Sequence, residues 1–193
     1  MNELFPIYVK MAQIETLLVG GGPVALEKLT AIYTNSPEAK VHIVATALTK
    51  TLRTFIKGKL NIRISERPFD PCDILGKDLI ILATNNEVLN SQIQTLAQHH
   101  HILLNVADKP ALCDFYLGSV VQKGNLKIGI STNGKSPTIA KRLKEFLQDL
   151  LPEEIDETLQ LMSQYRNQLK GDFQHKVQVL NKHTEDILGR GAI

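Results

Sequence analysis

The sequence predicts an α/β protein with a Rossmann-type parallel sheet, a small β-hairpin region and a C-terminal helical module. Three observations predict this fold. Short apolar runs alternate with helical patterns through the first half of the chain, and a glycine-rich turn follows the first run. After about residue 113 the alternation gives way to two short apolar segments and then to helical patterns. The expected regions are therefore residues 1–113, 114–150 and 151–193.

Five apolar runs are expected to form the sheet. Most of them are nearly continuous in Leu, Ile and Val, which indicates strands that helices cover on both faces, as in a parallel sheet. Between the first two runs, four apolar residues share one face of a helix that can pack on the sheet. The expected strands are residues 16–19, 41–44, 62–65, 79–83 and 102–106, and the helix face is Ala25, Leu29, Ile32 and Tyr33.

A hairpin and three helices are expected in the rest of the chain. Apolar segments at residues 116–121 and 126–131 flank a turn at residues 123–125 that contains a glycine, as in a β-hairpin. Ser136 can cap the next helix and Pro137 can occupy its first position, and this helix is expected to end near residue 150. Two further helical faces are Ile155, Leu159, Met162 and Leu169 before a break at Gly171, and Phe173, Val177, Leu180 and Ile187 after it.

Composition restricts the class of protein. With 193 residues, 22% of them charged, and a formal net charge of +2, the chain lacks the basic excess of a nucleic-acid binder, and no nucleic-acid partner is expected. Cys72 and Cys113 are far apart and indicate neither disulfides nor a zinc site, which fits a cytoplasmic protein. No signal peptide or membrane span is expected. Histidines 99–101 cannot all face one point on a helix or strand, so no metal site is expected.

The strongest chemical signal is a G-x-G-x-x-A pattern between the first expected strand and the first expected helix. Gly20 permits a tight turn, Gly22 lets the backbone approach a pyrophosphate without a Cβ, and Ala25 allows close packing of the helix on the strand. Backbone N–H groups and the helix dipole then face the phosphates. A glycine-rich turn without a ligand is the alternative interpretation. The expected dinucleotide-binding residues are Gly20, Gly21, Gly22, Pro23 and Val24.

Two other loops are expected to border the same crevice. Leu48 and Thr49 follow the second strand, and Thr84 and Asn85 follow the fourth, although each pair could equally be a helix cap. Sites selective for NAD often carry an acidic residue about 20 positions beyond the glycines. The second strand instead ends in residues 44–46, Val-Ala-Thr, with neither an acid nor an arginine. The pattern itself therefore leaves NAD against NADP open.

Several blocks together resemble one family. They are Leu4-Phe5-Pro6-Ile7-Tyr8, Leu18-Val19-Gly20-Gly21-Gly22, Ala83-Thr84-Asn85, Asn105-Val106-Ala107-Asp108, Cys113-Asp114-Phe115 and Ser131-Thr132-Asn133-Gly134-Lys135-Ser136-Pro137. In order and spacing they resemble the precorrin-2 dehydrogenase / sirohydrochlorin ferrochelatase family, the dehydrogenase module of siroheme synthases. The resemblance covers most of the chain.

The resemblance implies dehydrogenation of precorrin-2 to sirohydrochlorin, with NAD as the hydride acceptor. It also implies a homodimer, which makes residues 114–150 a dimerisation region, and it names Asp108 as the catalytic carboxylate. Asp108 follows the fifth strand, at the edge of the sheet where such folds bind ligands, and could accept a proton. A simple turn at residues 108–110 is the alternative. Some relatives also insert ferrous iron, and the sequence leaves that activity undecided.

The segment before the helix at Pro137 is expected to bind substrate carboxylates. Gly134 lets the chain bend, Lys135 offers a charge, and the start of the helix presents N–H groups to an anion. The expected substrate-binding residues are Asn133, Gly134, Lys135 and Ser136. Two other functions compete with the dehydrogenase: a non-catalytic Rossmann regulator that senses the NAD/NADH ratio, and a reductase of another anionic small molecule.

Overall fold

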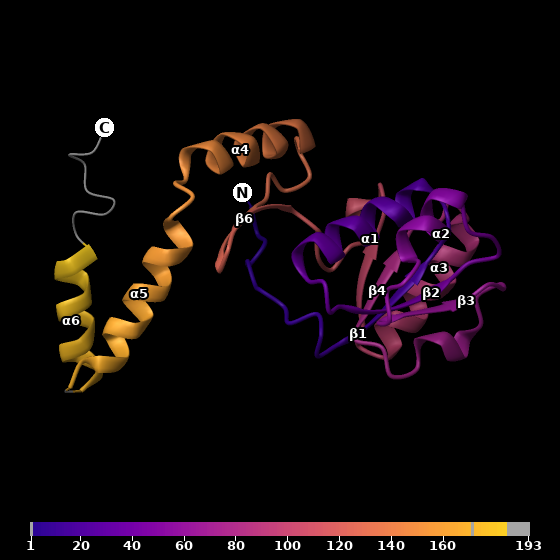
Figure 1. The fold of residues 1–193 in the computed structure, drawn as a ribbon. Helices are drawn as coiled ribbons and strands as arrows, with labels where there is room; N and C mark the ends of the chain where they lie inside the picture. Colours follow the sequence, from indigo (N-terminus) through magenta and orange to yellow (C-terminus); the bar gives the residue numbers. More distant parts are fainter. Residues whose placement is uncertain (1, 171, 185–193) are drawn as a thin grey trace. The chain divides into compact units, whose positions relative to one another are not determined.

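A computed structural model of the chain describes residues 2–170 and 172–184, which fall into two units (Figure 1). The first unit comprises residues 1–118 and 131–136, and the second comprises residues 119–130 and 137–193. The hairpin and all three C-terminal helices therefore belong to the same unit. The expected finer boundary at residue 150 stays a prediction.

The first unit is built on a five-stranded parallel sheet in the order β3-β2-β1-β4-β5. The predicted strands are confirmed, with ends that shift by one residue or not at all. Because the chain passes from β3 at one edge to β4 beside β1, the strand order reverses between β1 and β4, where such sheets bind ligands. The strands are β1 (Glu15–Val19), β2 (Lys40–Val44), β3 (Ile62–Ser65), β4 (Leu79–Leu82) and β5 (Leu103–Val106).

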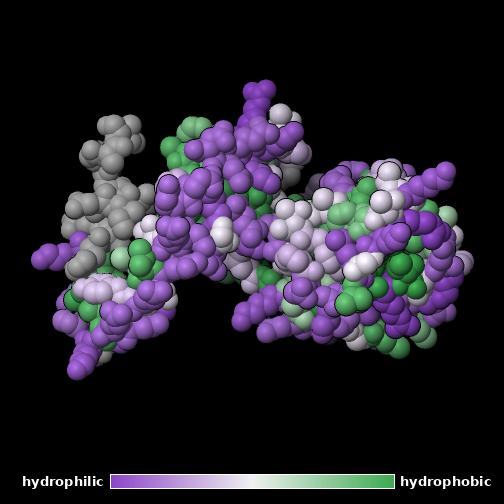
Figure 2. Space-filling model, viewed as in Figure 1, coloured by the Kyte–Doolittle hydropathy of each residue, from purple (hydrophilic) through white to green (hydrophobic). Residues whose placement is uncertain are grey.

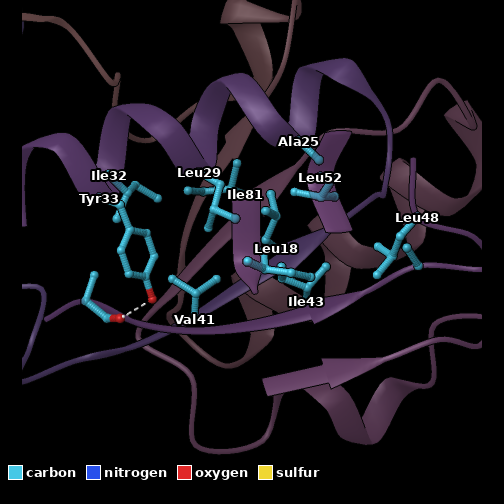
Figure 3. Packing of buried hydrophobic residues seen from close by; sticks show 13 residues of the cluster. Leu18, Ala25, Leu29, Ile32, Tyr33, Val41, Ile43, Leu48, Leu52 and Ile81 are labelled. Atoms are coloured by element: carbon cyan, nitrogen blue, oxygen red, sulfur yellow. Dashed lines mark hydrogen bonds between the residues drawn. The ribbon is translucent and has the colours of Figure 1, made fainter. Parts of the chain in front are cut away.

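Helices cover both faces of this sheet, as the continuous apolar strands predict (Figure 1). On one face, α1 (Pro23–Asn35) and α2 (Lys50–Ile56) pack on side chains such as Leu18, Ile43 and Ile81 (Figure 3). The predicted inner face of α1 is confirmed, since Ala25, Leu29, Ile32 and Tyr33 are all buried. On the other face lie the short helix η1 (Pro71–Ile74) and α3 (Glu87–His99).

The first strand of the hairpin was expected at residue 116, but β6 spans Ser119–Lys123. Phe115 and Leu117 instead pack against the core beneath α1, and the Tyr116 hydroxyl donates to the carbonyl oxygen of Pro110 at 3.2 Å. Tertiary contacts therefore keep this segment with the parallel sheet. The turn is also tighter than expected, because Lys123 pairs with Leu126 and only two residues lie between them.

The second unit contains the hairpin and three helices. Strand β6 pairs with β7 (Leu126–Ile130), and the predicted helix α4 (Pro137–Leu150) is confirmed. A small core of Val121, Ile130 and Ala140 joins the hairpin to α4. The other helices are α5 (Ile155–Gln168) and α6 (Phe173–Thr184). Gly171 and Ile187, named in the expected helical patterns, lie outside the described residues.

A buried carboxylate makes the stability of the first unit depend on pH. Asp73 in η1 accepts two hydrogen bonds from the Arg67 guanidinium, at 2.8 and 2.6 Å, and one from the Asp70 N–H at 2.9 Å. The Arg67 guanidinium holds the pKa of Asp73 below its ordinary value. The lowered pKa means that this stabilisation is complete above the pKa of an unfolded aspartate and is lost as the pH falls through the folded pKa.

Asp73→Asn is therefore expected to lower the free energy of unfolding by about 1–3 kcal/mol at pH 7. The difference from the wild type should shrink as the pH falls below about 4, because the wild-type carboxyl then becomes protonated. Urea unfolding across this range measures both effects. The exposed change Glu27→Gln is the control. A difference that stays constant with pH would contradict the assignment of the effect to the ionised pair.

Candidate functional site

At two positions of the turn between β1 and α1, neighbouring backbone atoms leave room for glycine only. Gly20 has a φ of 129°, and a Cβ there would lie 2.3 Å from the carbonyl oxygen of Ala83, just after β4. A Cβ on Gly21 would lie 1.9 Å from the carbonyl oxygen of Ala47, just after β2. No side chain can be accommodated against backbone at these distances. The turn therefore packs directly on the loops that follow the two neighbouring strands.

The third glycine faces open space. A Cβ on Gly22 would meet nothing within 4 Å among the described residues. Gly22 is the N-cap of α1 and offers no side chain to its first turn, whose N–H groups have no acceptors within the helix. Open space, backbone donors and the positive end of a helix dipole are what a pyrophosphate requires. The residues at this turn therefore fit the diphosphate of a dinucleotide.

The loop after β2 lies beside the glycine turn. The Thr49 N–H donates to the carbonyl oxygen of Gly21 at 2.9 Å, and the Thr49 hydroxyl caps α2 by accepting the Leu52 N–H at 3.4 Å. Leu48 is buried in the core beneath α1. The Thr49 side chain is therefore a helix cap, which was one of the two interpretations of this loop. Contact of Leu48 and Thr49 with a coenzyme stays a prediction.

The loop after β4 lies on the other side of the turn. The Thr84 hydroxyl accepts the Asn86 N–H at 3.1 Å, and Asn86 in turn caps α3 by accepting the Leu89 N–H at 3.1 Å. Asn85 is exposed between them. The structure therefore brings the expected loops to the same edge of the sheet, while their role as coenzyme contacts stays a prediction.

Asp108 lies just beyond β5 at this edge of the sheet. It is exposed, and its φ of 60° is in the left-handed region, which non-glycine residues rarely occupy. Its neighbour Lys109 forms an ion pair of 2.6 Å with Glu87 at the start of α3. Among the described residues, no hydrogen bond or ion pair involves the Asp108 carboxylate. The carboxylate is therefore available to a ligand at the carboxyl ends of the strands.

The half-buried thiol of Cys113 forms hydrogen bonds with the backbone on both sides of Asp108. Cys113 Sγ accepts the Val106 N–H at 3.2 Å and lies 3.2 and 3.3 Å from the carbonyl oxygens of Val106 and Lys109, to one of which it can donate. Burial raises the pKa of this thiol, which favours a hydrogen-bonding role over a nucleophilic one. The buried Asn105 amide also donates to the carbonyl oxygen of Phe115 at 2.8 Å. The backbone around Asp108 is therefore fixed.

The patterns in the sequence predict no specific role for Asn105, Cys113 or Asp114. Asp114 pairs with Leu104 twice, through its N–H at 2.8 Å and its carboxylate at 2.9 Å. The Cys113–Val106 and Asn105–Phe115 hydrogen bonds join two of the blocks that carry the family resemblance, and the Asp114–Leu104 contacts lie directly beside them. The polar residues within those blocks were the available signal, but sequence gives no partner for any of them.

The segment expected to bind substrate contains a tight turn. Asn133 and Gly134 have φ values of 55° and 73°, and the Lys135 N–H donates to the carbonyl oxygen of Thr132 at 3.1 Å, as in a type I′ turn. The Thr132 hydroxyl accepts the Ser136 N–H at 3.2 Å. Turn geometry thus accounts for the residue types at 133 and 134. Lys135 is exposed, and substrate binding by residues 133–136 stays a prediction.

No metal site is found in the part of the chain that the structure describes. His99 ends α3, His100 follows it with its ring edge-on to that of His99, and His101 has a φ of 55°. None of the described helices is long and apolar enough to span a membrane.

Two family models match the chain. The model described as "Putative NAD(P)-binding" matches residues 7–119, which contain the whole parallel sheet and the glycine turn. The model described as "Sirohaem biosynthesis protein central" matches residues 123–150, which contain β7 and α4.

The similar proteins include siroheme synthases. The sequence is 35% identical over 173 residues to a siroheme synthase of Vesicomyosocius okutanii subsp. Calyptogena okutanii (strain HA), covering 90% of this chain and 36% of that protein. It is 31% identical over 168 residues to a siroheme synthase of Thioalkalivibrio sulfidiphilus (strain HL-EbGR7), covering 87% and 34%. The chain thus spans about a third of the length of these relatives.

Among solved structures, one named "SirC, precorrin-2 dehydrogenase" is similar to this chain with a TM-score of 0.74. The similarity covers 95% of this chain and 90% of that chain, at 22% sequence identity. It shows that the two share a fold.

Proposed function

The chain belongs to the NAD(P)-binding family whose model matches residues 7–119, and from this premise we propose that it is a cytoplasmic NAD-dependent dehydrogenase that oxidises precorrin-2 to sirohydrochlorin. The substrate is supported by the matched sirohaem biosynthesis segment and by the similarity to siroheme synthases. The two free cysteines agree with a reducing compartment.

The observation that carries this proposal is the open space at Gly22. The turn as a whole packs against two loops, yet a Cβ on this one residue would face open space, and the N–H groups in the first turn of α1 have no acceptors within the helix. A protein that only needed a tight turn would gain nothing from a bare cap here, since Ser, Thr or Asp would stabilise the helix. The diphosphate of a dinucleotide explains the exception.

Asp108 is proposed as the residue that accepts the proton released during oxidation. When bound, NAD would take up the hydride removed from the tetrapyrrole. A proton must then leave the substrate, and an exposed carboxylate at the carboxyl edge of the sheet can accept it. The hydrogen bonds of Cys113 hold the backbone at Asp108 in position for this transfer.

Lys135 is proposed to attract the carboxylates of the substrate. Precorrin-2 is a polycarboxylate, and Lys135 is an exposed cation at the last position of the type I′ turn that precedes α4. An exposed ammonium steers and orients an anion more than it contributes to binding energy. The turn supports this proposal because it fixes the backbone from which Lys135 projects.

Turnover of purified protein tests the proposal. Incubation with precorrin-2 and NAD should produce NADH and the absorption spectrum of sirohydrochlorin in equal amounts. Binding of NADH without any turnover would favour the regulator that senses the NAD/NADH ratio. Turnover with a different anionic substrate, and none with precorrin-2, would favour the competing reductase.

We also propose that the protein is a homodimer joined through its second unit. Four large apolar side chains share one face of α4 at intervals of three or four residues, and the hairpin covers a different face. Figure 2 shows hydrophobic residues at the surface toward the end of this helix, beside hydrophilic ones. A second copy could bury this face. The four residues and their exposed fractions are Ile139 (61%), Leu143 (42%), Phe146 (60%) and Leu150 (62%).

Phe146→Ser is expected to shift the protein from dimer to monomer at micromolar concentration, because a central aromatic side chain often contributes 2 kcal/mol or more at an interface, roughly a thirtyfold change in dissociation constant. Sedimentation equilibrium measures the shift. Lys141→Ser, on an exposed polar position of the same helix, should leave the mass unchanged. A wild-type protein that is monomeric at all concentrations would refute the homodimer.

A further inference from the structure

The end of β2 lacks the acidic residue that often selects NAD. The structure nevertheless places an acidic residue, Glu66, and its cationic partner, Arg53, near this end. Val44 pairs with Ser65 of β3, and the Ala45 N–H donates to the carbonyl oxygen of Ser65 at 3.2 Å. Glu66 is the next residue after Ser65, so it lies beside the end of β2. This is the region of a Rossmann sheet where the ribose of the coenzyme is bound.

Glu66 forms an ion pair with Arg53 of α2. Hydrogen bonding to Arg53 is the main cause that lowers the pKa of Glu66. The same pair raises the pKa of Arg53. Both side chains are partly exposed, at 51% for Arg53 and 39% for Glu66, and can be reached by a ligand.

An exposed ion pair of this kind contributes little to stability. Its effect is on the charge that a ligand meets at the end of β2. Arginine is the residue that suits a 2′-phosphate, because its planar guanidinium binds phosphate through paired hydrogen bonds. Here Nη2 of the Arg53 guanidinium already donates a hydrogen bond to the Glu66 carboxylate. A 2′-phosphate would have to displace Glu66 or remain next to its negative charge.

We propose that the Arg53–Glu66 pair sets the coenzyme preference of this site: Glu66 engages Arg53 and repels a 2′-phosphate, so that the chain selects NAD over NADP. The acid that discriminates therefore comes from the end of β3 and not from the end of β2. This inference rests on the proposed coenzyme site at Gly22. It adds to that proposal the residues that discriminate between the two coenzymes.

Coenzyme binding can test the inference without any turnover. The fluorescence of NADH and NADPH gives the dissociation constant of each for the purified full chain. The wild type should bind NADH more tightly. Glu66→Gln should bind NADPH at least about tenfold more tightly than the wild type does. The reason is that the Arg53 guanidinium can then form a hydrogen-bonded charge pair with the 2′-phosphate. Its affinity for NADH should change by less than about threefold, since NADH carries no 2′-phosphate.

Two control variants separate this mechanism from a general effect of charge. Glu38→Gln makes the same change in net charge, but Glu38 lies just before β2, at the amino ends of the strands. This variant should leave the ratio of the NADH and NADPH dissociation constants unchanged. In the double variant Arg53→Gln/Glu66→Gln, the gain for NADPH should disappear.

Each outcome has one meaning. A ratio that Glu66→Gln does not move, with NADH still bound, would overturn this inference and leave the proposed function intact. A gain in NADPH affinity that survives in the double variant would overturn the role of Arg53. Failure of the wild type to bind either coenzyme would refute the coenzyme site, and with it both the proposed function and this inference.

Discussion

Replacing Asp108 by asparagine is expected to lower the turnover number for precorrin-2 by about a hundredfold or more, because the variant cannot accept the released proton. The dissociation constant for NADH should stay within about threefold of the wild-type value. A loss of turnover without a loss of coenzyme affinity is the pattern of a group that acts in the transition state. Steady-state kinetics and NADH fluorescence measure the two quantities separately.

Asparagine is the right replacement because of the backbone at this position. Asp108 has a φ of 60°, which Asp and Asn tolerate better than other residues with a Cβ. Asp108→Ala would add backbone strain of about 1–2 kcal/mol to the loss of the carboxylate, and the two effects could not be separated. Unchanged thermal stability of Asp108→Asn is the control. Full activity in this variant would exclude the carboxylate from the reaction.

Gly22→Val is expected to weaken NADH binding by about tenfold or more, because the side chain would fill the space in which the diphosphate approaches the start of α1. The fold should tolerate the change. Gly22 has a φ of −91° and a ψ of −169°, extended values that valine also adopts, and a Cβ meets no described atom within 4 Å. A weaker helix cap should cost only about 1 kcal/mol.

Gly21→Ala is the contrasting control for this prediction. Its Cβ would lie 1.9 Å from the carbonyl oxygen of Ala47, so the loops after β1 and β2 would have to separate. The variant should lose much of its thermal stability even without coenzyme, whereas Gly22→Val should lose coenzyme affinity at a cost in stability of only about 1 kcal/mol. If Gly22→Val binds NADH as the wild type does, the diphosphate does not lie at this turn.

Much of the first unit follows from local patterns in the sequence. Continuous apolar runs separated by helical faces predict a parallel sheet covered on both sides, because only such a sheet buries both faces of each strand. The glycine turn between β1 and α1 was likewise predictable, since its spacing matches a strand, a tight turn and a helix start. The start of α4 at Pro137 was predictable from a residue type that suits the first position of a helix.

Other features depend on contacts between residues that are distant in sequence. The first strand of the hairpin was expected to begin at residue 116, but Leu117 packs on the core beneath α1, so the hairpin begins at Ser119. The residues 133 and 134 were expected to bind substrate, and their types are explained by a type I′ turn.

Periodicity and glycine spacing act over a few neighbouring residues, so they were enough to predict the order of the strands and helices along the chain and the position of the glycine turn between β1 and α1. The need for Gly20 and Gly21 in backbone packing, and the open space in front of Gly22, became visible only in the folded chain. The tertiary structure also brought Glu66 beside Arg53 at the end of β2. Such approaches depend on how strands pair and loops pack, which no local pattern of residues encodes.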